Sequence, residues 1–127
     1  LLKAVKDLAQ KVSQLNGLEI QVVHHGMTNR LENSLELSIF RIIQELITNI
    51  IKHAQAKTAT IHLINHGDSL NIMVEDDGLG FNPQHITARS QGMGISSIDK
   101  RVNHLDGSLT IESAPGEGAT VIIDIPI

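Results

Sequence analysis

Two carboxylates and two glycines follow an apolar stretch in the segment V-E-D-D-G-L-G-F at residues 74–81. Residues 69–76 alternate as in a strand, and side chains of a strand alternate faces with a period of two, so Asp76 shares the face of the apolar residues. An ionised carboxylate on such a face is costly unless it is hydrogen-bonded. The pattern therefore indicates either a local backbone partner or a ligand that offers donors.

Six of the ten glycines form three Gly-x-Gly pairs, at Gly78 and Gly80, Gly92 and Gly94, and Gly116 and Gly118. One pair alone would indicate a turn, whereas three pairs, one after an inward carboxylate and one opening a helix, favour a ligand site. The helix predicted from Ile95 or Ser96 would offer free N–H groups to an anion. The spacings match neither a P-loop nor a dinucleotide-binding fingerprint.

A polar stripe runs along the long helix predicted before these glycines. Glu45, Asn49 and Lys52 lie within about 40° of one another at 100° per residue, and Ser38 and Arg41 extend the line. One interpretation is the solvated face of an amphipathic helix. Asn49 favours a functional face instead, because asparagine is a poor choice for helix stability.

Periodicity predicts the elements that must position these groups. Leu1, Val5, Leu8, Val12 and Leu15 form a heptad seam, which predicts either a helix that pairs with another helix or an amphipathic helix packed on its own domain. The further elements are a strand at 18–24, a helix capped by Asn33 or Ser34 and running to about 54, a hairpin of strands 58–65 and 69–76, a long loop at 77–93, a helix from about 95 to 105, and a hairpin of strands 109–113 and 119–125. This order predicts an α+β fold, a two-layer sandwich with a mixed, mostly antiparallel sheet covered on one face by helices.

Composition excludes several classes of function. The 127 residues fit one domain, and 10 basic against 14 acidic residues give a net charge of −4, which argues against non-specific nucleic-acid binding. Cysteine is absent, so disulfides and thiolate chemistry are excluded, in keeping with a cytoplasmic location. No apolar run approaches the length of a membrane span, so we expect no direct membrane contact by this segment.

Four segments together resemble the catalytic ATP-binding domain of sensor histidine kinases. Residues 45–54 (E-L-I-T-N-I-I-K-H-A) resemble the N box, 76–81 the G1 box, 92–95 the G2 box and 115–120 the closing Gly-x-Gly-Thr segment. Their order and spacing are those of the ATPase superfamily shared by DNA gyrase, Hsp90 chaperones, histidine kinases and MutL. Arg101-Val102 followed by Leu105-x-Gly107 is similar to the nitrate-sensor and DesK-type kinases. The resemblance covers residues 18–127 and implies a Bergerat-type fold.

The resemblance implies ATP and Mg²⁺ as ligands and a role for each matching residue. Asp76 would bind the adenine amine, Asn49 would ligate Mg²⁺, and Glu45 would lie near the metal or orient a reacting group. The remaining implied contacts are Gly78 and Gly80 beside the base, Lys52 and His53 on phosphate oxygens, Gly92, Met93, Gly94 and Ile95 in a lid over the triphosphate, and Thr120 at the adenine end.

The chain departs from the kinase pattern in small and large ways. Asp77 stands where the family often has Asn, and Ile95 where Leu is common. No phosphoacceptor box surrounds any of the seven histidines, so the resemblance places the acceptor upstream, with residues 1–16 as the tail of a dimerisation helix and 17–127 as the catalytic domain. The implied partners are those upstream helices, a second copy of the whole protein and a response regulator. Two alternatives stay open: an ATP-hydrolysing clamp with Glu45 as general base, and an interaction module that has lost nucleotide.

Overall fold

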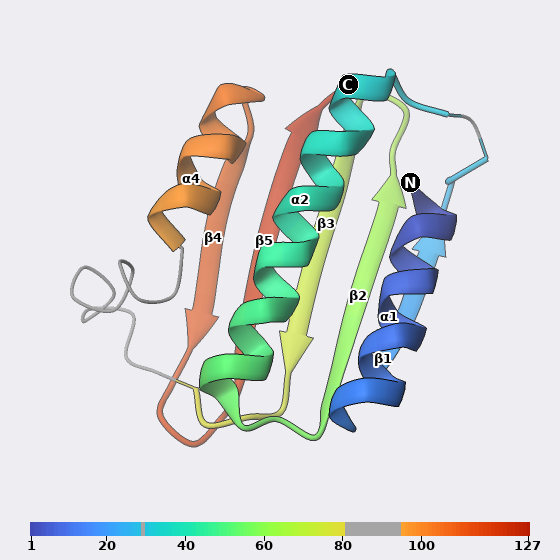
Figure 1. Cartoon of the computed structure of the whole chain (residues 1–127). Helices are drawn as coiled ribbons and strands as arrows, with labels where there is room; N and C mark the ends of the chain where they lie inside the picture. The colour runs from blue at the N-terminus through green and yellow to red at the C-terminus, as the bar shows by residue number, and fades with distance from the viewer. Residues whose placement is uncertain (29, 81–94) are drawn as a thin grey trace.

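The computed structural model describes residues 1–28, 30–80 and 95–127. In chain order the elements are α1 (Leu2–Asn16), β1 (Glu19–His25), α2 (Asn33–Asn49), the π-helix η1 (Ile50–Ala54), β2 (Thr58–Asn65), β3 (Ser69–Asp76), α4 (Ile95–His104), β4 (Ser108–Ser113) and β5 (Ala119–Pro126) (Figure 1). Within these ranges no helix combines the length and the apolar character that crossing a membrane requires.

The strands form one sheet in the order β1-β2-β3-β5-β4. β1 pairs with β2 in parallel, and the other three pairings are antiparallel. The helices α1, α2 and α4 lie on the same side of this sheet (Figure 1). The predicted two-layer architecture, with a mixed and mostly antiparallel sheet, is therefore confirmed.

The core between the layers is aliphatic. α2 contributes Ile39, Ile42, Ile43 and Ile47, which follow helical spacing and are at most 1% exposed. The sheet contributes alternate residues of three strands, all of them fully buried: Ile61, Leu63, Leu70, Ile72, Ile123 and Ile125. This alternation fixes the register, because a slip by one residue would turn every apolar side chain to the other face.

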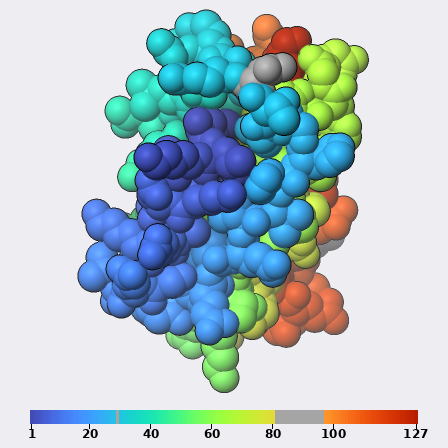
Figure 2. Space-filling view, turned by 90° about the vertical axis from the view of Figure 1, so that its right-hand side faces the viewer, coloured from blue at the N-terminus to red at the C-terminus, as the bar shows by residue number. Residues whose placement is uncertain are grey.

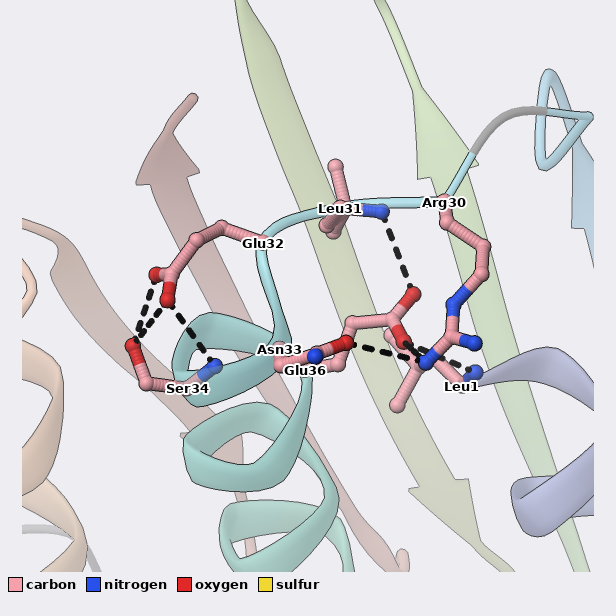
Figure 3. Close-up of polar contacts among 7 residues, drawn as sticks. All are labelled: Leu1, Arg30, Leu31, Glu32, Asn33, Ser34 and Glu36. Carbon is pink, nitrogen blue, oxygen red and sulfur yellow. Dashed lines mark hydrogen bonds and ion pairs between the residues drawn. The ribbon is translucent and has the colours of Figure 1, made fainter.

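The start of α2 is held by two glutamates (Figure 3). Glu32 is the N-cap, and its carboxylate accepts hydrogen bonds from the backbone N–H and the hydroxyl of Ser34. The prediction that Asn33 or Ser34 caps this helix is therefore wrong. Ser34 instead donates to the cap, which lies two residues earlier.

Glu36 is the buried charge of this region. Burial by itself would raise the pKa of its carboxyl group, but the backbone N–H of Leu31, the amino group of Leu1 and the guanidinium of Arg30 together hold the pKa below its ordinary value. Arg30 also donates to Asn33 (Figure 3). These contacts fix the chain where it enters α2, and so fix the direction of the helix.

α1 lies against the sheet edge formed by β1 and also touches α2. Val5, Ala9 and Val12 are buried there, whereas Leu15 at the other end of the heptad seam is 72% exposed. Figure 2 shows α1 and β1 as adjoining surface on this side of the molecule. Most of the seam therefore packs against the rest of the described chain and is not left exposed for another helix.

Candidate functional site

Asp76 ends β3 on the side of the sheet that carries the helices. Its cross-strand partner on β5 is Ala119, just as Val74 faces Val121 in the apolar layer. The side chain is half-buried, and Oδ1 accepts the backbone N–H of Gly78 at 2.8 Å. Burial raises the pKa of Asp76, the Gly78 contact opposes this, and the neighbouring Asp77 adds to it. A carboxylate accepts about four hydrogen bonds, so the turn uses part of its capacity.

Asp77 has a different role one residue later. It is exposed, and its Oδ1 accepts the backbone N–H groups of Lys57 at 2.9 Å and Thr58 at 3.0 Å. These bonds, first that from Thr58, lower the pKa of Asp77. The residue thereby ties the end of β3 to the start of β2, a structural role that an asparagine oxygen would also serve.

Two glycines let three backbone segments meet beside Asp76. A Cβ on Gly78 would lie 2.2 Å from the carbonyl oxygen of Ala54, which also accepts the N–H of Leu79 at 2.7 Å. A Cβ on Gly118 would lie 2.2 Å from the carbonyl oxygen of Asp76. The end of the N-box segment, the G1 turn and the start of β5 are therefore in close backbone contact.

Gly80 belongs to the same junction. It has a φ of +65°, and a Cβ there would lie 2.1 Å from the carbonyl oxygen of Ala114. The N–H of Gly116 donates to the carbonyl of Leu79. The resemblance places Gly78 and Gly80 beside a base, and the structure shows that backbone packing already requires a glycine at both positions.

The N box spans a change of helix type. α2 ends at Asn49 and continues as the π-helix η1. Such π-turns are rare in proteins, and those that occur are often found at functional sites. Glu45 and Asn49, at i and i+4 of the regular helix, share a face, whereas the 100° count used for Lys52 no longer holds beyond Ile50. Lys52 and His53 are both exposed.

Glu45 contacts α4 rather than its own helix. Ser97 Oγ donates to Glu45 Oε1 at 3.4 Å, and Arg101 Nε lies 3.9 Å from Glu45 Oε2. In the part of the chain that the structure describes, Oε2 and Nε are both shielded from solvent and lack a hydrogen-bond partner. The sequence did not predict this contact, although Arg101 stood in a segment that carried the resemblance.

A groove of about 300 Å³ continues between α2 and α4 beyond this pair. Its lining includes two cations and consists of Ser38, Lys100, Arg101, His104 and Leu105. Ser38, which extends the polar stripe, is thus on the face of α2 that faces α4. The two helices lie side by side and run in opposite directions (Figure 1).

The structure contradicts the role expected for Thr120. Thr120 is opposite Glu75 in the pairing of β3 with β5, one residue away from the pair of Asp76 and Ala119. Because side chains alternate faces, Thr120 lies on the sheet face away from the helices and from Asp76. Ala119 holds the position beside Asp76.

Gly92, Met93 and Gly94, which the resemblance assigns to a lid, lie outside the described residues. Ile95 is the first residue of α4, which agrees with the predicted helix start. Among the residues described, no group of three or more His, Asp or Glu side chains is arranged to hold a metal ion.

Comparison with known proteins places this arrangement in a family. Residues 34–127 match the family described as histidine kinase-, DNA gyrase B- and HSP90-like ATPase. The chain belongs to this family, and its similarity within the family is to the ATP-binding domains of sensor histidine kinases. The sensor histidine kinase ComP of Bacillus subtilis (strain 168) is 35% identical over 127 residues, which are 100% of this chain and 16% of ComP. The kinase/phosphatase DegS of Brevibacillus brevis is 30% identical over 128 residues, 100% of this chain and 32% of DegS.

Solved structures agree on the fold. The blue-light activated histidine kinase of Erythrobacter litoralis EL346 aligns with a TM-score of 0.77 at 22% identity, over 96% of this chain and 40% of that one. The mycobacterial sensor histidine kinase MprB aligns with a TM-score of 0.75 at 16% identity, over 98% of this chain and 93% of that one. The chain spans less than a third of the length of the two curated relatives, so it corresponds to one part of proteins of that kind.

Proposed function

We propose that this chain binds Mg-ATP and passes the γ-phosphoryl group to a histidine on a dimerisation segment outside the chain. The observation that carries the proposal is the half-buried carboxylate of Asp76, on the helix side of the sheet and beside the junction of Ala54, Gly78 and Gly118. An adenine amine is a donor of the right kind for that carboxylate.

The proposed reaction balances without a further reactant. A histidine nitrogen forms a bond to the γ-phosphorus, the bond to the bridging oxygen of the β-phosphate breaks, and ADP leaves. Phosphoryl transfer depends mainly on positioning and charge neutralisation. Asp76 would hold the base, and Lys52 and His53, exposed just beyond the end of α2, would meet the phosphate oxygens.

The donor set at the end of α2 fits a magnesium ion shared with phosphates. Asn49 offers a side-chain oxygen, and Mg²⁺ usually takes one or two protein oxygens and completes its shell with water and phosphate. When bound, the ion neutralises charge on the phosphates. Asn49 would hold it at the last regular turn of α2, one helical turn after Glu45.

The wider setting follows from the kinase proposal. We expect upstream helices to carry the acceptor histidine and to form a homodimer in the full-length protein, with a response regulator as the next acceptor. A cytoplasmic location, the lid role of Gly92, Met93, Gly94 and Ile95, and the division of the chain at residues 16 and 17 are parts of the same proposal.

Two rivals are less well supported. A clamp-type ATPase would use Glu45 as general base on water, but the carboxylate of Glu45 is directed to Ser97 and Arg101. A module without nucleotide would not need a charged group at Asp76, where burial penalises ionisation. The curated relatives are both named as histidine kinases.

The test combines binding with transfer. Isothermal titration of the chain with Mg-ATP should give a saturable heat, and addition of γ-labelled ATP together with the upstream segment should give a label that is labile in acid and stable in base. Asn49→Ala should weaken Mg-ATP while leaving ADP in EDTA unchanged. Absence of any binding heat would exclude the kinase and the clamp alike, and label released as free phosphate without any protein label would favour the clamp.

A further inference from the structure

The contact between Glu45 and Arg101 connects the N box to α4. Glu45 stands one turn before Asn49, and Ser97 and Arg101 are one turn apart on α4, so both α4 side chains reach the same carboxylate. The side chains of Glu45 and Arg101 are 37% and 41% exposed, yet the two facing atoms, Oε2 and Nε, are shielded from water.

Shielding of two opposite charges at 3.9 Å has a clear physical consequence. A carboxylate oxygen removed from water requires a donor, and the nearest cation in the described structure is the guanidinium of Arg101. A shortening of about 1 Å would turn the contact into a charge-assisted hydrogen bond of the usual length. Glu45 is therefore oriented toward α4 by Ser97 on one oxygen and by Arg101 on the other.

This orientation determines what Glu45 is able to do to water. A general base must lie within hydrogen-bond reach of the proton it takes, with a lone pair directed at that proton. An oxygen that is shielded from water and faces Arg101 does not meet this requirement. In hydrolysis, a water oxygen would bond to the γ-phosphorus, its proton would pass to Glu45, and the bond to the β-phosphate oxygen would break.

We propose that Arg101 is a positioning residue that withholds Glu45 from water and so directs the γ-phosphoryl group of ATP to a protein acceptor rather than to hydrolysis. The inference rests on the proposed function, since it presupposes Mg-ATP beside Glu45. Arg101 also lines the groove between α2 and α4, so truncation of its side chain would open a path for water toward Glu45.

The experiment measures phosphate release from Mg-ATP by the purified chain without any acceptor. Arg101→Ala should raise the turnover roughly tenfold, less than the 10²- to 10⁴-fold that a fully positioned base supplies. Ser97→Ala is a small change that removes the hydrogen bond to Glu45 Oε1, and it should raise phosphate release by less than Arg101→Ala does. Adding Glu45→Gln to Arg101→Ala should return turnover to the wild-type level, because the freed base is then gone.

Lys100→Ala is the matched control, because it removes a cation from the same groove that has no contact with Glu45 in the described structure. Its phosphate release should equal that of the wild type. The inference is overturned if Arg101→Ala and Ser97→Ala bind Mg-ATP as the wild type does but release no more phosphate, or if the rise persists without the Glu45 carboxylate. Failure of the wild-type chain to bind Mg-ATP would instead refute the proposed function, and with it the inference.

Discussion

Asp76 is held in two environments at once, an apolar layer and a polar turn. Burial raises its pKa, so over the range between the unfolded and folded pKa values the folded state binds more protons than the unfolded state. Stability therefore falls as pH rises through that range, and the penalty is fully present above the folded pKa. A ligand that donates to the carboxylate would offset this cost.

Asp76→Asn should separate stability from binding. The amide keeps an oxygen for Gly78 but carries no charge, so the variant without nucleotide should melt at the wild-type temperature or higher at pH 7, and the difference should fade below about pH 3.9, the ordinary aspartate pKa. Binding of ADP should weaken about 10- to 100-fold, the range of a hydrogen bond to a charged group. Thermal melts over pH and titration with ADP measure the two effects. Unchanged ADP affinity would refute the adenine role of Asp76.

The same substitution at Asp77 should change the melting temperature at pH 7 in the opposite direction. Hydrogen bonds from Thr58 and Lys57 lower its pKa, so its contribution is present above the unfolded pKa and is lost as pH falls through the folded pKa. Asp77→Asn keeps an acceptor without the charge, so it should lower the melting temperature at pH 7 and converge with the wild type in acid. Because Asp77 is exposed, the effect should be small, and ADP affinity should stay unchanged. A larger loss of ADP affinity than in Asp76→Asn would reverse the two assignments.

At the scale of elements, the turn after β3 depends on backbone contact with the end of η1. Gly78 does not have a positive φ, so alanine would suit its backbone conformation and by itself would be stabilising by about 0.4–1 kcal/mol. The added Cβ would meet the Ala54 carbonyl at 2.2 Å. Gly78→Ala should therefore destabilise the chain by about 1–3 kcal/mol, the usual cost of overpacking.

Urea denaturation of Gly78→Ala checks this reasoning against Gly17→Ala. Gly17 has a φ of +73°, but no atom lies within 4 Å of the place that an alanine methyl would take, so alanine there should cost about 1 kcal/mol through backbone conformation alone. A stabilising effect of Gly78→Ala would show that the segments move apart easily. In that case the close junction beside Asp76 would not be a fixed part of the site.

Alternation and helical spacing were sufficient to predict the helices and strands within the described residues, because each apolar face is read directly from the sequence. The sheet, the inward side of Asp76 and the start of α4 at Ile95 followed from those periods. Thr120 was misassigned because strand register depends on a partner far along the chain, and Ala119 turned out to face Asp76. The contact of Glu45 with Arg101 was missed because 56 positions separate the two residues and no local pattern relates them.

For the molecule as a whole, residues 1–16 either belong to this domain or connect it to upstream helices. Burial differs along the heptad seam of α1, since Val5 is fully buried and Leu15 is mostly exposed. Full burial of a valine is worth about 1.5–3 kcal/mol, part of which is offset by the entropy of ordering the helix. α1 thus contributes a substantial part of a net stability that is usually about 5–15 kcal/mol.

A chain of residues 17–127 should therefore lose about 3 kcal/mol in the free energy of unfolding, measured by urea denaturation, because removal of α1 exposes the apolar surface of β1 and α2. Two point variants of the whole chain provide the comparison without truncation. Val5→Ala should cost about 2 kcal/mol, whereas Leu15→Ala should stay within about 0.5 kcal/mol. Equal stability of the truncated and whole chains would uphold the division at residues 16 and 17. The expected loss would instead show that α1 is a structural helix of the ATP-binding domain, and it would contradict the proposed division at residues 16 and 17.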